Sequence, residues 1–81
     1  MGMDRFDRDI LKYMLLWDPH GGLNDEDLYP EFGMNVHQFR RRFVDLISTY
    51  ELGVLKPADR DLVETARRYH RYCQIKRAVT L

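Results

Sequence analysis

Cysteine is nearly absent from this 81-residue chain, and its scarcity limits how the domain can be stabilised. Cys73 is the single cysteine, so the chain can form neither an internal disulfide nor a four-cysteine zinc site. A lone thiol is typical of a reducing compartment. The three histidines add little, because a zinc site needs four ligands at recognisable spacing and only His70 and Cys73 form such a pair. We expect no metal and no other cofactor.

Long hydrophobic runs are also missing. No apolar stretch approaches the roughly 20 residues that a helix needs to span a bilayer. The first residues, Met1 to Asp4, lack the basic and then apolar order of a signal peptide, and Phe6 breaks the pattern for N-myristoylation. We therefore expect a cytoplasmic protein that makes no membrane contact.

Neither sign of charge is in excess overall, but the charges are unevenly distributed. The chain has 13 basic and 13 acidic residues. Residues 1–34 hold 3 Lys or Arg against 8 Asp or Glu, whereas residues 35–81 hold 10 against 5. Such asymmetry favours a basic face for an anionic partner. Attraction between the two halves of the fold is the alternative explanation.

The spacing of apolar residues along the chain is typical of α-helices. Apolar residues make up 44% of it, and they recur at helical spacing rather than in alternation. We predict an all-α class: one compact domain over residues 1–81, with three to four helices near 4–17, 25–32, 35–51 and 57–77. The largest side chains should supply much of the core, namely Phe6, Trp17, Phe32, Phe39, Phe43 and Tyr69.

The second predicted helix is interrupted by proline. Asn24 or Asp25 can cap its start, and Leu28 lies on its apolar side. Pro30 removes a backbone hydrogen bond and crowds the preceding turn, at a cost of about 3 kcal/mol inside a helix. We therefore expect only one to two turns, tightening towards a 3₁₀ helix near Pro30.

The third predicted helix has the clearest pattern. Gly33 can adopt a positive φ before it, and Asn35 can cap it. Its apolar face falls at 3.6-residue spacing and comprises Val36, Phe39, Phe43, Leu46, Ile47 and Tyr50. At about 100° per residue, the side chains that point away from this face are those of His37, Arg41 and Asp45, with Gln38 close by.

A short helix, a glycine turn and a longer helix are the parts of a helix-turn-helix, whose second helix enters the major groove of DNA. The residues that we expect to face base edges are His37, Gln38 and Arg41. Those that we expect on phosphates are Asn35, Arg40 and Arg42. A second set of backbone contacts from the last helix comprises Arg67, Arg68 and Arg71. The pattern predicts sequence-specific binding of double-stranded DNA by a transcriptional regulator, with a homodimer as one arrangement.

Asp45 opposes this interpretation, because a carboxylate on the outward face repels phosphate. An ion pair with Arg41, one turn earlier, would remove the conflict, although such exposed pairs contribute only about 0.3–0.5 kcal/mol. A charged face that serves only solvation is therefore the competing explanation of the arginines.

The order of these elements also resembles a small helix-turn-helix family of actinobacteria and their phages. The residues that carry the resemblance are Asp7-Arg8-Asp9-Ile10-Leu11, Trp17, Phe32-Gly33-Met34, Phe39, Leu46-Ile47, Leu62-Val63 and Arg67-Arg68. Asn35 stands where the family usually has a serine, which keeps the cap, and Tyr29-Pro30 departs from its pattern. The resemblance implies a DNA-binding or regulatory role and names no target.

Two other functional classes are weighed against DNA binding. No arrangement typical of a nucleophile or of a phosphate-binding loop is present, so we expect no enzyme. A protein–protein adaptor is the stronger competitor, because Tyr13, Trp17 and Tyr72 could anchor an interface and the acidic first half could meet a basic partner.

Overall fold

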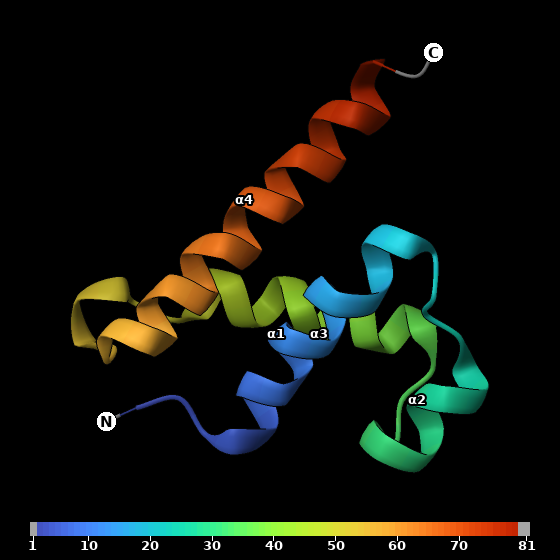
Figure 1. The fold of residues 1–81 in the computed structure, drawn as a ribbon, viewed down its shortest axis with the longest axis horizontal. Coiled ribbons are helices and arrows are strands. Elements are labelled where there is room, and N and C mark those ends of the chain that lie inside the picture. Colours follow the sequence, from blue (N-terminus) through green and yellow to red (C-terminus); the bar gives the residue numbers. More distant parts are fainter. Residues whose placement is uncertain (1, 80–81) are drawn as a thin grey trace.

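The computed structural model describes residues 2–79, which form helices and no strand (Figure 1). The α-helices in that stretch are α1 (Arg5–Trp17), α2 (Asp25–Phe32), α3 (Val36–Thr49) and α4 (Pro57–Val79). Two short 3₁₀ turns, Asp18–His20 and Leu52–Val54, follow α1 and α3. The predicted all-α class is confirmed, and each predicted helix is present within about two residues of its expected ends.

Helix α1 begins where the sequence predicts. The carboxylate of Asp4 accepts a hydrogen bond from the amide of Asp7 at 2.8 Å, which is the N-cap that its residue type favours. The helix buries Ile10, Leu11 and Met14. It gives way to a 3₁₀ turn at Asp18, although Asp18 itself keeps helical backbone angles, with φ at −64° and ψ at −38°, despite the proline that follows it.

Helix α2 stays α-helical through Pro30, so the expected tightening to 3₁₀ is wrong. Its eight residues make about two turns, and both of its ends are capped. The side chain of Asn24 accepts from the amide of Asp27, and Gly33, at a φ of 68°, donates to the carbonyl of Tyr29. Complete burial of Leu28 further offsets the single hydrogen bond that the proline removes.

Helix α3 starts with a reciprocal capping box. The Asn35 side chain accepts from the amide of Gln38 at 2.8 Å, and the Gln38 side chain accepts from the amide of Asn35 at 3.0 Å. The predicted apolar face does turn inward: Phe39, Phe43, Leu46 and Ile47 are buried. Three residues, 33–35, therefore separate α2 from a well-defined α3.

The core is aliphatic with an aromatic centre, and it is smaller than predicted. Phe39 is completely buried, and its ring lies 5.1 Å from Phe32 and 5.8 Å from Tyr13. Phe6 and Trp17 were expected inside, but each is 44% exposed. They stand near the two ends of α1, where no helix covers them fully, so the apolar stripe of that helix is buried only in its middle.

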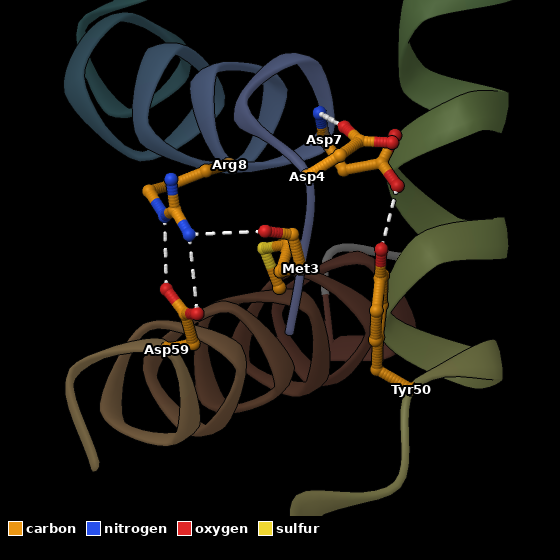
Figure 2. A network of polar contacts seen from close by, with 6 residues as sticks. All are labelled: Met3, Asp4, Asp7, Arg8, Tyr50 and Asp59. Atoms are coloured by element: carbon orange, nitrogen blue, oxygen red, sulfur yellow. Dashed lines mark hydrogen bonds and ion pairs between the residues drawn. The ribbon is translucent and has the colours of Figure 1, made fainter. Parts of the chain in front are cut away.

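Polar contacts join the start of α1 to α3 and α4 (Figure 2). The Arg8 guanidinium donates to both carboxylate oxygens of Asp59 at 2.9 and 3.2 Å, and also to the carbonyl of Met3 at 3.0 Å. The Tyr50 hydroxyl donates to Asp7 at 2.7 Å. The first of these contacts ties α1 to α4, and the second ties α1 to the end of α3.

Burial and these contacts together shift the pKa values of Asp59 and Tyr50. The hydrogen bond from Arg8 holds the pKa of Asp59 below its ordinary value, despite burial acting in the other direction. Burial raises the pKa of Tyr50 to about 12, and its hydrogen bond to the Asp7 carboxylate contributes in the same direction.

Helix α4 packs on the core by its first half and extends beyond the other helices with its second half (Figure 1). Val63 and Ala66 are completely buried. The Arg67 guanidinium donates to the carbonyls of Ile47 at 2.8 Å and Tyr50 at 2.7 Å, which satisfies two acceptors at the end of α3. Arg67 therefore joins the end of α3 to α4.

Candidate nucleic-acid interface

The outward side of α3 carries the three residues that were predicted to face bases. His37, Gln38 and Arg41 are all exposed, because the buried face of the helix turns them towards solvent. No ion pair involves Arg41 in residues 2–79. An ion pair between Arg41 and Asp45 is therefore not formed, and Asp45 stays exposed on the same side of the helix. We call His37, Gln38, Arg41 and Asp45 the crest of α3.

The arginines on either side of Arg41 are held by the two ends of α1. Arg40 contacts Asp18 at 2.7 Å, and Arg42 contacts Asp7 at 3.6 Å. Both carboxylates are largely buried, whereas the two arginine side chains remain about half exposed. A guanidinium has five N–H donors, so each arginine keeps donors for a phosphate while its direction is fixed.

The start of α3 is less open to a phosphate than the sequence suggests. The amide of Gln38 is taken by the Asn35 cap, and the amide of Val36 donates to the Asp25 carboxylate of α2 at 2.8 Å. A carboxylate beside a helix N-terminus offsets part of the positive dipole that would attract an anion. The Asn35 side chain is therefore engaged in capping, and the exposed donors of this region belong to side chains.

The second predicted set of backbone contacts is divided by the structure. Arg67 is engaged with the end of α3, as described above. Arg68 is exposed and donates to the hydroxyl of Thr65 at 3.4 Å, and Arg71 is exposed. Arg67 is thus engaged within the fold, whereas Arg68 and Arg71 are exposed on α4.

The uneven charge distribution has a structural counterpart. Three ion pairs join an acidic or basic residue of the first 34 residues to one of opposite charge in the remainder: Arg8 with Asp59, Asp18 with Arg40, and Asp7 with Arg42. Attraction between the two halves of the chain is therefore real. Arg41 lies between these two paired arginines on α3. Within residues 2–79 it forms no ion pair with a carboxylate.

Sequence reasoning missed the carboxylate of Asp18 as an organising group. It accepts from the Tyr69 hydroxyl at 2.6 Å and from Arg40, so it joins the end of α1 to α3 and α4. No local pattern reveals this contact, because Asp18 lies in a turn and its partners are 22 and 51 residues away.

No protein-family model matches this chain, and neither the curated proteins nor the solved structures provide a significant match. The geometry of the domain must therefore support any function by itself. Within residues 2–79, no helix is long and apolar enough to cross a membrane. In the same range, no group of three or more His, Cys, Asp or Glu side chains is arranged to hold a metal ion.

Proposed function

We propose that this domain binds double-stranded DNA by placing α3 in the major groove, and that it acts as a cytoplasmic transcriptional regulator. The observation that carries the proposal is the arrangement of α2, a three-residue turn with a left-handed Gly33, and a capped α3 whose outward side is exposed. A helix-turn-helix needs a short turn of this kind and a second helix that is free on one side. The kinship with the actinobacterial and phage helix-turn-helix family is part of the same proposal.

The crest residues read the bases in this proposal. Arg41 is best suited to guanine, whose O6 and N7 accept its two parallel donors, and Gln38 is suited to adenine. His37 lies one turn before Arg41 and offers a ring nitrogen to a base edge. These side chains project from a single helix face, which matches how recognition helices contact a few successive base pairs.

The flanking arginines hold the helix in register. Arg40 and Arg42 leave opposite sides of α3, and their carboxylate partners, Asp18 just after α1 and Asp7 within it, restrict where each guanidinium points. Contacts from such side chains to phosphates position a protein on DNA without reading its sequence. Asp45 lowers affinity for DNA in general, so the domain relies on its base contacts more than a uniformly basic helix would.

A salt series tests the proposal. Fluorescence anisotropy with a labelled random duplex measures affinity from 25 to about 300 mM salt. Binding to phosphates predicts that the logarithm of the association constant falls by about 0.9 per logarithmic unit of salt for each phosphate neutralised. Loss of Arg40 or Arg42 should lower this slope by about one. No binding at the lowest salt concentration contradicts the proposal.

A protein–protein adaptor is the second candidate, and exposed apolar side chains favour it. Tyr72 and Ile75 are each 58% exposed on the part of α4 that extends beyond the core. Aromatic side chains of this kind anchor many protein interfaces. The same surface would also suit a second copy of this chain, because DNA readers with a helix-turn-helix often bind two half-sites as dimers. Failure to bind DNA, together with a partner captured through Tyr72, would favour the adaptor.

A further inference from the structure

A groove lies between α3 and the second half of α4, and the last turn of α1 closes its base. The two helices run in opposite directions, because contacts that advance along α4 step back along α3. Arg67 meets Ile47, and His70 meets Phe43 with their rings 6.5 Å apart. Beyond these contacts α4 runs away from α3 (Figure 1). Side chains of both helices line a groove of about 530 Å³ that is open to solvent on one side.

The base of the groove is apolar. Met14 of α1 and Phe43 of α3 are buried beneath it, and Val44 and Cys73 form its partly exposed walls. The lone cysteine is therefore a partly buried residue in the wall of this groove. An aliphatic or aromatic group placed here would lose contact with water on the side that faces the base of the groove.

The rim of the groove is cationic. His37 and Arg41 line it from α3, and Arg77 lines it from α4. Neither Arg41 nor Arg77 forms an ion pair within residues 2–79. Asp18 is the one carboxylate among the lining residues, and it already accepts from Arg40 and from the Tyr69 hydroxyl. The uncompensated charge around the opening is positive.

We propose that this groove binds a small amphipathic anion. Its apolar body lies on Met14, Phe43 and Val44, and its carboxylate or similar group lies between Arg41 and Arg77. The volume falls in the range of roughly 300–1,000 Å³ that is typical of small-molecule sites. One turn of a helix about 10 Å wide and 5.4 Å long fills roughly 400 Å³. A partner helix would thus gain hardly more than one turn of contact, which favours the small ligand.

Occupation of this groove would regulate the proposed DNA-binding function. Arg41 belongs both to the crest of α3 and to the rim of the groove. An anion held by Arg41 would neutralise it and compete with a base or a phosphate for its donors. This consequence rests on the proposed function, whereas binding of the anion itself does not.

Two probes of equal chain length test the site. The full chain, labelled with ¹⁵N, is titrated with octanoate and with 1-octanol, and amide chemical shifts report the place and strength of binding. The proposal predicts saturable shifts around Val44 and Cys73. It also predicts that octanoate binds at least about tenfold more tightly than octanol, since a hydrogen bond to a charged group is worth that factor. Equal affinity for the two probes, or shifts elsewhere, would overturn it.

A pair of matched variants adds a control for charge. R77Q should weaken octanoate binding by about fivefold or more and leave octanol binding unchanged, because it removes one side of the charge clamp. R5Q removes the same charge from an exposed position at the start of α1 and should change neither. Equal loss in both variants would mean that only net charge matters, and the site would be rejected. Tight binding of an acidic amphipathic peptide without octanoate binding would also reject it.

The link to DNA is measured separately. Octanoate added to a preformed DNA complex should lower the affinity for DNA in wild type and have a smaller effect in R77Q. If octanoate binds in the groove but DNA is never bound, the ligand site stands and the proposed function fails. If DNA is bound through α3 and octanoate is not bound, the ligand site alone fails.

Discussion

Tyr69 donates its hydroxyl hydrogen to the carboxylate of Asp18 at 2.6 Å, across 51 residues of sequence. The same carboxylate holds Arg40 at 2.7 Å, so one acidic side chain joins α4, the end of α1 and the flank of α3. Burial of the phenol and its bond to Asp18 both raise the pKa of Tyr69, which keeps it a donor. The position of the proposed DNA-binding helix therefore depends on a contact with α4.

Removing this hydroxyl should destabilise the fold. Tyr69→Phe leaves the Asp18 carboxylate with Arg40 alone, and hydrogen bonds to charged groups are worth about 1.5–3 kcal/mol. We expect a decrease of that size in the free energy of unfolding, measured by urea denaturation. Tyr72→Phe removes a hydroxyl from an exposed side chain of the same helix and should change the midpoint little. An equal change in the free energy of unfolding for both substitutions would show that the hydrogen bond to Asp18 does not stabilise the fold.

The Tyr50 phenol should make the folded state sensitive to alkali. Its pKa in the folded protein is about 12, above the ordinary value of 10. A raised pKa means that the contribution of Tyr50 to stability is complete below about pH 10 and is lost as pH rises towards 12. Ultraviolet absorbance of tyrosinate should show that Tyr50 titrates late, as Tyr69 also should, and that Tyr50→Phe removes one of these late-titrating groups. The same late-titrating tyrosine absorbance in wild type and Tyr50→Phe, measured on folded protein, would contradict the buried bond to Asp7.

The pair between Arg8 and Asp59 should affect stability at the opposite end of the pH range. The pKa of Asp59 is lowered by Arg8, so its contribution is present above its ordinary value of 3.8 and is lost as pH falls through the folded-state value. Asp59→Asn should be less stable than wild type at neutral pH and should lose less stability between pH 5 and 2. The exposed Asp61, two residues away, gives the matched control Asp61→Asn. Parallel pH profiles for wild type and Asp59→Asn would refute the assignment.

Substitutions of Gly33 test whether the turn between α2 and α3 needs a left-handed backbone conformation. Gly33 has a φ of 68°, and nothing lies within 4 Å of where its Cβ would be, so a substitution there is strained but not crowded. Gly33→Ala should therefore cost about 1–2 kcal/mol, the ordinary penalty for a left-handed residue with a side chain, and Gly33→Asn should cost less. Gly53 also has open space but no positive φ. Thermal unfolding of Gly53→Ala should show no such loss, and equal losses at both sites would exclude backbone strain as the cause.

Much of the local structure could be predicted from the sequence, because caps and turns depend on neighbouring residues. Asp4, Asn24 and Asn35 each cap the helix that follows them, and Gly33 takes the expected left-handed conformation. The effect of Pro30 was predicted less well. Propensity treats a proline as a helix breaker, whereas packing of Leu28 and the cap at Gly33 hold α2 together.

Tertiary contacts were beyond the reach of the sequence. Tyr69 was expected in the core but is only partly buried, whereas Val63 and Ala66 of the same helix are completely buried, since only the first half of α4 is covered. The charge split indicated that the halves of the chain could attract each other. The charge distribution in the sequence could not indicate which arginines of α3 form ion pairs. Arg40 and Arg42 are paired and Arg41 is not, because the pairing depends on where α1 lies against α3.

The most direct test of the central claim, that α3 reads DNA, compares two arginine variants. A preferred duplex is first selected from a random pool with wild-type protein, and affinities for it and for a scrambled duplex are then measured by anisotropy. Arg41→Ala should lose about 1–3 kcal/mol on the preferred duplex and much less on the scrambled one, because it removes a base contact. Arg5→Ala, which removes an exposed charge from α1, should leave the ratio of the two affinities unchanged. An unchanged ratio in Arg41→Ala would contradict the account.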